Sequence, residues 1–200
     1  MIEIDFHKKL NYEEIEIKKY VFSSVKKCFE TLKKNQEDYY LSILLTNNYD
    51  IKKLNNKFRK INKPTNVLSF IQDEKLCLNR SKRVILLGDI VISLEKISSE
   101  AKNLGKKFSD HFIHMCIHGL LHLFGYNHKK DSEAKIMQEK EISILKKLSI
   151  PSPYALENSL KLKSIPFFSS LRASLFITGI LVKKSIKFFL LIEPVLQRVR

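Results

Sequence analysis

The sequence predicts an α+β protein in which a small mixed β-sheet of about four strands packs against helices. Two hydrophobic patterns support this class: short apolar or alternating segments typical of strands, and longer segments with apolar residues at helical spacing. Their predicted order, β-α-β-α-β-β-α-α-α, is not the strict alternation of a parallel α/β sheet. One late helix is apolar on almost every face, so we expect it to lie in the core.

The amino-terminal part is predicted to alternate between strands and helices. Its first strand is half-buried, because Ile2, Ile4 and Phe6 alternate with acidic residues. The second helix has a polar start at Asn48 or Asp50, residue types that cap helices. The expected elements are a strand over residues 2–6, a helix over 12–34, a strand over 39–46 and a helix that ends near residue 60.

The following part is predicted to hold two strands and three helices. Pro64 interrupts the chain before the third strand, and Gly105 ends the third helix. Ser109 or Asp110 is expected to cap the apolar helix. The expected elements are strands over residues 67–71 and 84–93 with a polar loop at 79–82, then helices over 95–104, from 109 or 110 onward, and over 131–148, before Pro151 and Pro153.

The apolar helix carries a histidine motif that predicts a catalytic metal site. His118 and His122 are four residues apart, so they project from one helical face. Gly125 can adopt the left-handed conformation that ends a helix and lets His128 return to the same point. Three converging imidazoles with a fourth position open are typical of catalytic zinc. Histidines in a core, or a structural zinc with a fourth protein ligand, are the alternatives.

The motif has the spacing of the long zincin signature but lacks that signature's glutamate. Gly119 follows the first histidine, where a zinc peptidase has its general base. Neutral imidazoles leave the charge of zinc uncompensated, so a water at the open position ionises near about pH 7 without a dedicated base. A metallopeptidase therefore stays an alternative that Gly119 disfavours.

Charge and cysteine content suggest an intracellular protein with a polyanionic partner. The net charge is +15, which favours binding to nucleic acid, although a general bias towards Lys and Asn would also raise it. Cys28, Cys77 and Cys116 are odd in number and scattered, which fits no disulfide framework and favours a reducing compartment. The amino terminus is too polar for a signal peptide, so we expect a cytoplasmic protein.

The chain is predicted to divide into a domain over residues 1–150 and a basic, partly apolar extension over residues 151–200 of unknown role. The extension holds eight Lys or Arg against Glu157 and Glu193. A flexible or loosely helical tail, a surface-binding amphipathic segment and a membrane span within Ser164 to Val182 are the alternatives. Pro166 and Gly179 make the span the weakest of them.

Several motifs together resemble the YbeY-type endoribonucleases, bacterial metal-dependent factors for rRNA maturation. The resemblance covers about residues 1 to 150, with its blocks in the family's order and spacing. The matching stretches are His111 to His128, Leu54-Asn-Asn-Lys-Phe-Arg59, Pro64-Thr-Asn-Val-Leu-Ser-Phe70, Leu87-Gly-Asp-Ile-Val-Ile-Ser93 and the pair Met137 and Glu141.

The resemblance implies one zinc ion bound by His118, His122 and His128, a functional arginine at Arg59, and a zincin-like α+β core. It also implies cleavage of single-stranded RNA, a role in maturation of the 16S rRNA 3′ end and in ribosome quality control, and rRNA and the small ribosomal subunit as partners. No organic cofactor is expected. A non-catalytic assembly factor stabilised by zinc is a further alternative.

This chain departs from the family pattern at two positions. Asn66 and Asn127 stand where the family usually has Asp. The change beside His128 removes a carboxylate that accepts a proton or orients an imidazole, although an Asn carbonyl can still orient one. His114, one turn before His118, is expected to pack or to support a ligand. Asp89 is a candidate partner of a ligand imidazole, with a strand-end turn contact as the plainer reading.

Overall fold

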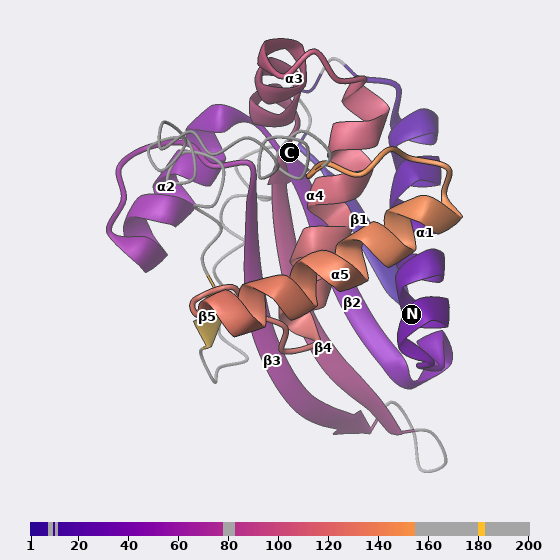
Figure 1. Ribbon diagram of the computed structural model, residues 1–200. Helices are drawn as coiled ribbons and strands as arrows, with labels where there is room; N and C mark the ends of the chain where they lie inside the picture. Colours follow the sequence, from indigo (N-terminus) through magenta and orange to yellow (C-terminus); the bar gives the residue numbers. More distant parts are fainter. Residues whose placement is uncertain (8–9, 11, 78–82, 155–179, 183–200) are drawn as a thin grey trace.

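The predicted α+β class is confirmed by the computed structural model (Figure 1), which describes residues 1–7, 10, 12–77, 83–154 and 180–182. The elements are β1 (Ile2–Phe6), α1 (Glu14–Leu32), the short 3-10 helix η1 (Gln36–Asp38), β2 (Tyr39–Thr46), α2 (Asn48–Arg59), β3 (Val67–Cys77), β4 (Arg83–Ser93), α3 (Leu94–Asn103), α4 (Phe108–Leu123), α5 (Asp131–Lys147) and β5 (Ile180–Val182).

The strands form one mixed sheet in the order β1-β2-β4-β3-β5. β1, β2 and β4 are parallel, β3 is antiparallel to β4, and β5 is parallel to β3. The four predicted strands are present. β5 is an additional strand of three residues from the carboxy-terminal region, paired with Ser69 to Ile71 of β3.

Helices cover both faces of this sheet. Alternating strand residues pack on one side with α1, α3, α4 and α5, and on the other side with Ile51 of α2. α4 contacts β3, β4, α1, α3 and α5, and Figure 1 shows it between the sheet and α5. Almost every side chain of α4 is buried, as its apolar composition predicted. The helix that carries the histidine motif is therefore held from all sides.

Apart from shifts of one or two residues at other element ends, the structure corrects the prediction at three places. β3 runs to Cys77 rather than residue 71, because its second half continues the pairing with β4 beyond an irregularity between Ile71 and Glu74. The cap of α2 is Asn47, whose Oδ1 accepts a hydrogen bond from the Asp50 backbone N–H at 2.9 Å. α4 begins at Phe108 after Lys107, with no side-chain cap, so neither Ser109 nor Asp110 caps it.

Two predictions concern segments that are mostly not described. The loop over residues 79–82 lies outside the described residues, as does Ser164 to Gly179 of the possible membrane span. Within the described part of the chain, no helix has the length and apolar character that crossing a membrane requires.

Candidate metal centre

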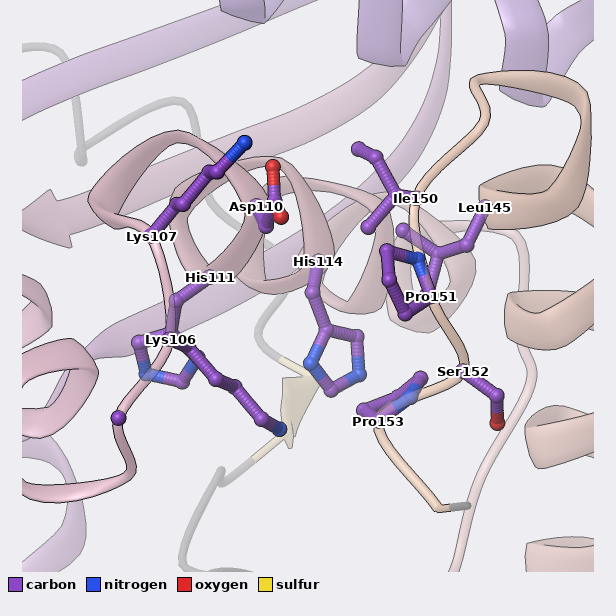
Figure 2. Close-up of a pocket in the computed structure, with 11 residues that line it drawn as sticks. Lys106, Lys107, Asp110, His111, His114, Leu145, Ile150, Pro151, Ser152 and Pro153 are labelled. Carbon is purple, nitrogen blue, oxygen red and sulfur yellow. The ribbon is translucent and has the colours of Figure 1, made fainter.

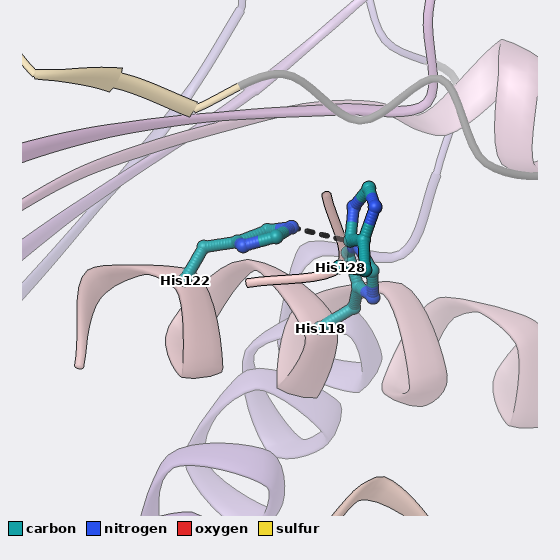
Figure 3. A group of neighbouring side chains, drawn as sticks. All are labelled: His118, His122 and His128. Carbon is teal, nitrogen blue, oxygen red and sulfur yellow. Dashed lines mark hydrogen bonds between the residues drawn. The ribbon is translucent and has the colours of Figure 1, made fainter. Parts of the chain in front are cut away.

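α4 and the turn that follows it bring the three predicted ligands together. His118 and His122 are buried, one turn apart on the same helical face. Gly125 has φ +86°, and the backbone N–H of Tyr126 reaches back to the Leu121 carbonyl at 3.0 Å. This left-handed helix end, predicted from the sequence, reverses the chain so that His128 faces the helix (Figure 3).

The rings face one point closely enough to share one ion. One ring nitrogen from each of His118, His122 and His128 lies within 4.8 Å of the other two. The Nε2 atoms of His118 and His122 are 2.9 Å apart. Among the described residues, no fourth His, Cys, Asp or Glu belongs to this cluster. The arrangement can therefore hold a metal ion while leaving a coordination position for another ligand.

The hydrogen bonds of the outer ring nitrogens fit a cation between the inner ones. His118 Nδ1 lies 2.6 Å from Glu141 Oε1, and His122 Nδ1 lies 2.9 Å from the Tyr126 carbonyl oxygen. A carbonyl and an ionised carboxylate only accept hydrogen bonds, so each Nδ1 carries the proton. In neutral rings both Nε2 lone pairs then face each other. The two lone pairs repel each other unless a cation lies between them and binds both. The donor set therefore fits a metal such as zinc.

Burial keeps these ligands in their metal-binding form. Burial, and after it the neighbouring His118, lowers the pKa of His122 to about 3. The pKa of His128 is also lowered, first by burial and then by His118, with a smaller effect from Arg59. Near neutral pH both rings are therefore uncharged, as coordination requires.

Glu141 of α5 is the centre of the hydrogen bonding around His118. Its carboxylate is 1% exposed, and its second oxygen faces His114 Nε2 at 3.2 Å and accepts a hydrogen bond from the Tyr154 hydroxyl. Burial alone raises the pKa of Glu141, but interactions with His118 and His114 outweigh burial and hold it well below its ordinary range. Glu141 therefore places a fixed negative charge behind a candidate ligand. His114 lies beside this support rather than in the cluster.

Gly119 lies on the face of α4 that packs closely against the sheet. A Cβ at this position would stand 3.2 Å from side-chain atoms of Val67, Ser69 and Ile90. The Ser69 hydroxyl also donates to the Gly119 carbonyl at 3.1 Å. A longer side chain would have to enter the packed layer between helix and sheet. A glutamate at this position would therefore crowd β3 and β4.

Arg59 ends α2 and lies near the cluster. Its effect on the pKa of His128 places its charge within electrostatic reach of that ring. Its Nη1 is 3.5 Å from Asn55 Oδ1, and the buried Asn55 side chain donates to the Lys63 carbonyl at 2.7 Å. Burial lowers the pKa of Arg59 somewhat, as expected for a half-buried guanidinium.

The two asparagines that depart from the family pattern have different surroundings. Asn127 Oδ1 accepts a hydrogen bond from the His128 backbone N–H at 2.8 Å, so it orders the turn rather than an imidazole. Asn66 donates to Glu100 at 3.1 Å, while its own oxygen accepts from the Val67 N–H. An Asp at position 66 would set a second carboxylate beside Glu100, which the Asn avoids.

Asp89 shows no contact with the three histidines in the structure. Its carboxylate accepts a hydrogen bond from Gln72 Nε2 at 2.5 Å, between the interiors of β4 and β3, so the predicted strand-end turn contact is wrong as well. The Tyr126 carbonyl and Tyr154 were not anticipated from the sequence. The family pattern includes Glu141, but the sequence alone does not place it beside His118.

The fold and site define an α+β protein with a three-histidine centre, two of its rings buried, on and after one helix. Comparison with known proteins gives the family. The family described as Endoribonuclease YbeY matches residues 3–149, and the chain belongs to it. The predicted family is thereby confirmed, and its enzyme class is that of the hydrolases.

Curated relatives support the same assignment. Endoribonuclease YbeY of Bartonella bacilliformis is 48% identical over 115 residues, covering 57% of this chain and 71% of the relative. The protein of that name from Francisella tularensis is 41% identical over 114 residues, covering 57% and 70%. Among solved structures, TM1509 of Thermotoga maritima has a TM-score of 0.49 at 24% identity, covering 84% of this chain and 99% of that protein.

Proposed function

We propose that the protein is a zinc-dependent endoribonuclease specific for single-stranded RNA. It acts in maturation of the 16S rRNA 3′ end and in ribosome quality control, with rRNA and the small ribosomal subunit as cytoplasmic partners. The observation that carries the proposal is the cluster of His118, His122 and His128 within a chain of the YbeY family. The net charge of +15 is consistent with a polyanionic substrate.

The three histidines would hold one zinc ion through ring nitrogens, with Glu141 and the Tyr126 carbonyl fixing the orientation of two rings. When bound, zinc supplies a Lewis acid that stabilises negative charge and favours ionisation of water near neutral pH. Arg59 would bind a phosphoryl oxygen of the RNA, because its guanidinium lies near His128 and forms charge-assisted hydrogen bonds with phosphate. This role needs no carboxylate at position 119.

The test compares cleavage by wild type and two site variants on a single-stranded fragment spanning the 16S rRNA 3′ end. His118→Ala should abolish cleavage, and chelation should do the same until zinc is returned. Arg59→Gln should lower kcat about 100-fold, the usual effect of removing one charge-stabilising donor. Lys52→Gln, which removes an exposed charge from the same helix α2, is the matched control and should cleave normally.

Undiminished cleavage by His118→Ala would mean that the activity belongs to a contaminating nuclease. Zinc binding and rRNA binding without turnover in any preparation would instead support the non-catalytic assembly factor. Either result would overturn the proposed activity.

A further inference from the structure

Tyr154 lies beyond the residues that match the family, yet it contacts the support of the candidate metal centre. The family match ends at residue 149. The Tyr154 hydroxyl donates a hydrogen bond to Oε2 of Glu141, the buried carboxylate whose Oε1 faces His118 Nδ1 at 2.6 Å. A single carboxylate therefore separates Tyr154 from a candidate metal ligand.

The segment after α5 turns back towards α4 (Figure 1). Ser149 has φ +58°, and the backbone N–H of Ile150 donates to the Leu145 carbonyl at 3.0 Å. This left-handed turn ends the helix and reverses the chain. The side chain of Ile150 packs against the apolar core, so the reversed segment is anchored where it begins.

Two prolines then lead the chain past His114. A proline ring fixes φ, so Pro151 and Pro153 leave this segment few backbone conformations. Figure 2 shows Pro153 beside the His114 ring. The Tyr154 ring meets the same imidazole edge to face, with ring centroids 6.0 Å apart, and the Tyr154 N–H donates to Ser152 Oγ at 3.3 Å. Backbone and ring contacts therefore both hold Tyr154 in place.

Donors at one oxygen of Glu141 leave the other oxygen for His118. Oε2 accepts from the Tyr154 hydroxyl and faces His114 Nε2 at 3.2 Å. The terminal torsion of a glutamate side chain has a broad distribution, so a carboxylate with a single partner turns easily. Hydrogen bonds at Oε2 restrict that torsion, and Oε1 then stays directed at His118 Nδ1.

We propose that Tyr154 is a positioning residue of the metal centre. Its hydroxyl holds the Glu141 carboxylate in the orientation that accepts from His118 Nδ1, and this keeps His118 Nε2 directed at the ion. A hydrogen bond to an ionised carboxylate is stronger than one between neutral groups, which suits this role. The role rests on the proposed binding of zinc by the three histidines and does not require RNA cleavage.

The test measures the zinc affinity of the full-length protein by chelator competition. Tyr154→Phe keeps the ring against His114 and removes only the hydroxyl, so it separates positioning from packing. Zinc affinity should fall about tenfold, the lower end of the effect of losing a supporting partner. Tyr20→Phe is the matched control, because it removes a hydroxyl that donates to the exposed Glu16 on α1, and it should leave zinc affinity unchanged.

Two further measurements show whether the hydroxyl acts through Glu141. In a Glu141→Ala background no carboxylate is left to position, so Tyr154→Phe should cause no further loss of zinc affinity. In zinc-loaded protein labelled with ¹⁵N-histidine, Tyr154→Phe should shift the NMR resonance of His118 Nδ1. The resonance of His122 Nδ1, which donates to the Tyr126 carbonyl, should stay in place.

Equal zinc affinity of wild type and Tyr154→Phe, or an unmoved His118 Nδ1 resonance, would overturn the positioning role while leaving the metal centre intact. A loss of the same size in the Glu141→Ala background would also overturn it; if Glu141→Ala does not fold, the His118 resonance decides. A wild-type protein that binds no zinc would overturn the metal centre and this role together. Zinc binding without RNA cleavage would overturn the proposed activity alone.

Discussion

At the scale of single residues, Glu141 fixes the orientation of the His118 ring in the candidate metal centre. Its two oxygens contact His118 and His114, and it is almost fully buried. Glu141→Gln keeps an oxygen that accepts from His118 Nδ1 but removes the charge. Loss of such a supporting carboxylate usually weakens zinc binding about 10–100-fold, and we expect the same here. Zinc affinity, measured by chelator competition, checks this.

The control for this change lies on the same helix. Glu139 of α5 is exposed, so Glu139→Gln removes an equal charge without touching a ring and should leave zinc affinity unchanged. If both variants bind zinc as tightly as wild type, Glu141 has no part in holding the metal.

Asp89 is expected to make folding stability depend on pH. Burial raises its pKa from 3.8 to about 6, although hydrogen bonds from Gln72 and Ser42 oppose this. As pH rises from about 4 through 6, the unfolded chain releases this proton first, so Asp89 lowers the free energy of unfolding by up to about 3 kcal/mol. Asp89→Asn removes that penalty and should stabilise the protein more at pH 7.5 than at pH 4.

Urea unfolding of both proteins at the two pH values gives this difference directly. Other titrating groups are common to wild type and variant, so their effects cancel. A stability difference that is the same at pH 4 and pH 7.5 would show that the buried carboxyl titrates normally.

Residue types at local spacing were sufficient to find the three histidines, whereas their partners were not predictable in the same way. His118 and His122 share a helix, and Gly125 indicated the turn to His128. Glu141 lies 23 residues from His118 in sequence, so only the packing of α5 on α4 brings them together. The sequence shows that Gly119 stands where zinc peptidases have their general base. In the structure, a side chain at this position would meet side chains of the sheet.

At the scale of elements, the left-handed end of α4 sets the position of His128. Gly125 has φ +86° and nothing within 4 Å of an added Cβ, so Gly125→Ala costs only backbone strain, about 1–2 kcal/mol. Relief of that strain would move the turn that carries His128, so zinc affinity should fall together with stability. Thermal unfolding and chelator competition measure the two effects.

Gly105 provides a matched comparison at the end of α3. It has φ +62° and equally open surroundings, so Gly105→Ala should cost similar stability. Because it ends a different helix and does not form the turn that carries His128, zinc affinity should not change. Equal losses of zinc affinity in the two variants would mean that general destabilisation, rather than the turn, weakens the site.

Helices and strands were predictable from sequence where their apolar residues follow one regular spacing. The residues at which these elements end were not predictable in this way. The four main strands and five α-helices follow from apolar spacing. β3 was predicted too short because polar residues from Gln72 onward interrupt its pattern, although backbone pairing with β4 continues. β5 escaped prediction because its pairing with β3 depends on a contact between distant parts of the chain.

At the scale of the whole molecule, α4 is the element that organises the rest. It carries His118 and His122 and is surrounded by the sheet, α1, α3 and α5. A helix buried on all sides cannot tilt without moving its neighbours, so the ligand positions are fixed by the core itself.

The overall charge predicts how RNA binding depends on salt. With a net charge of +15, binding of single-stranded RNA should weaken linearly in log–log form as salt rises, with a slope of about −0.7 per phosphate contacted. A footprint of about six phosphates would lose roughly 300-fold in affinity between about 50 and 200 mM salt. Fluorescence anisotropy with a labelled oligoribonucleotide measures the slope.

Comparison of variants then assigns part of that slope to particular contacts. Arg59→Gln should reduce its magnitude by about 0.7 if the guanidinium binds one phosphate. Lys52→Gln should leave the slope unchanged, because no contact with RNA is proposed for this exposed lysine. An affinity that does not change with salt would show that the protein binds RNA through contacts other than the phosphates. The positive net charge of the protein would then indicate a partner other than RNA.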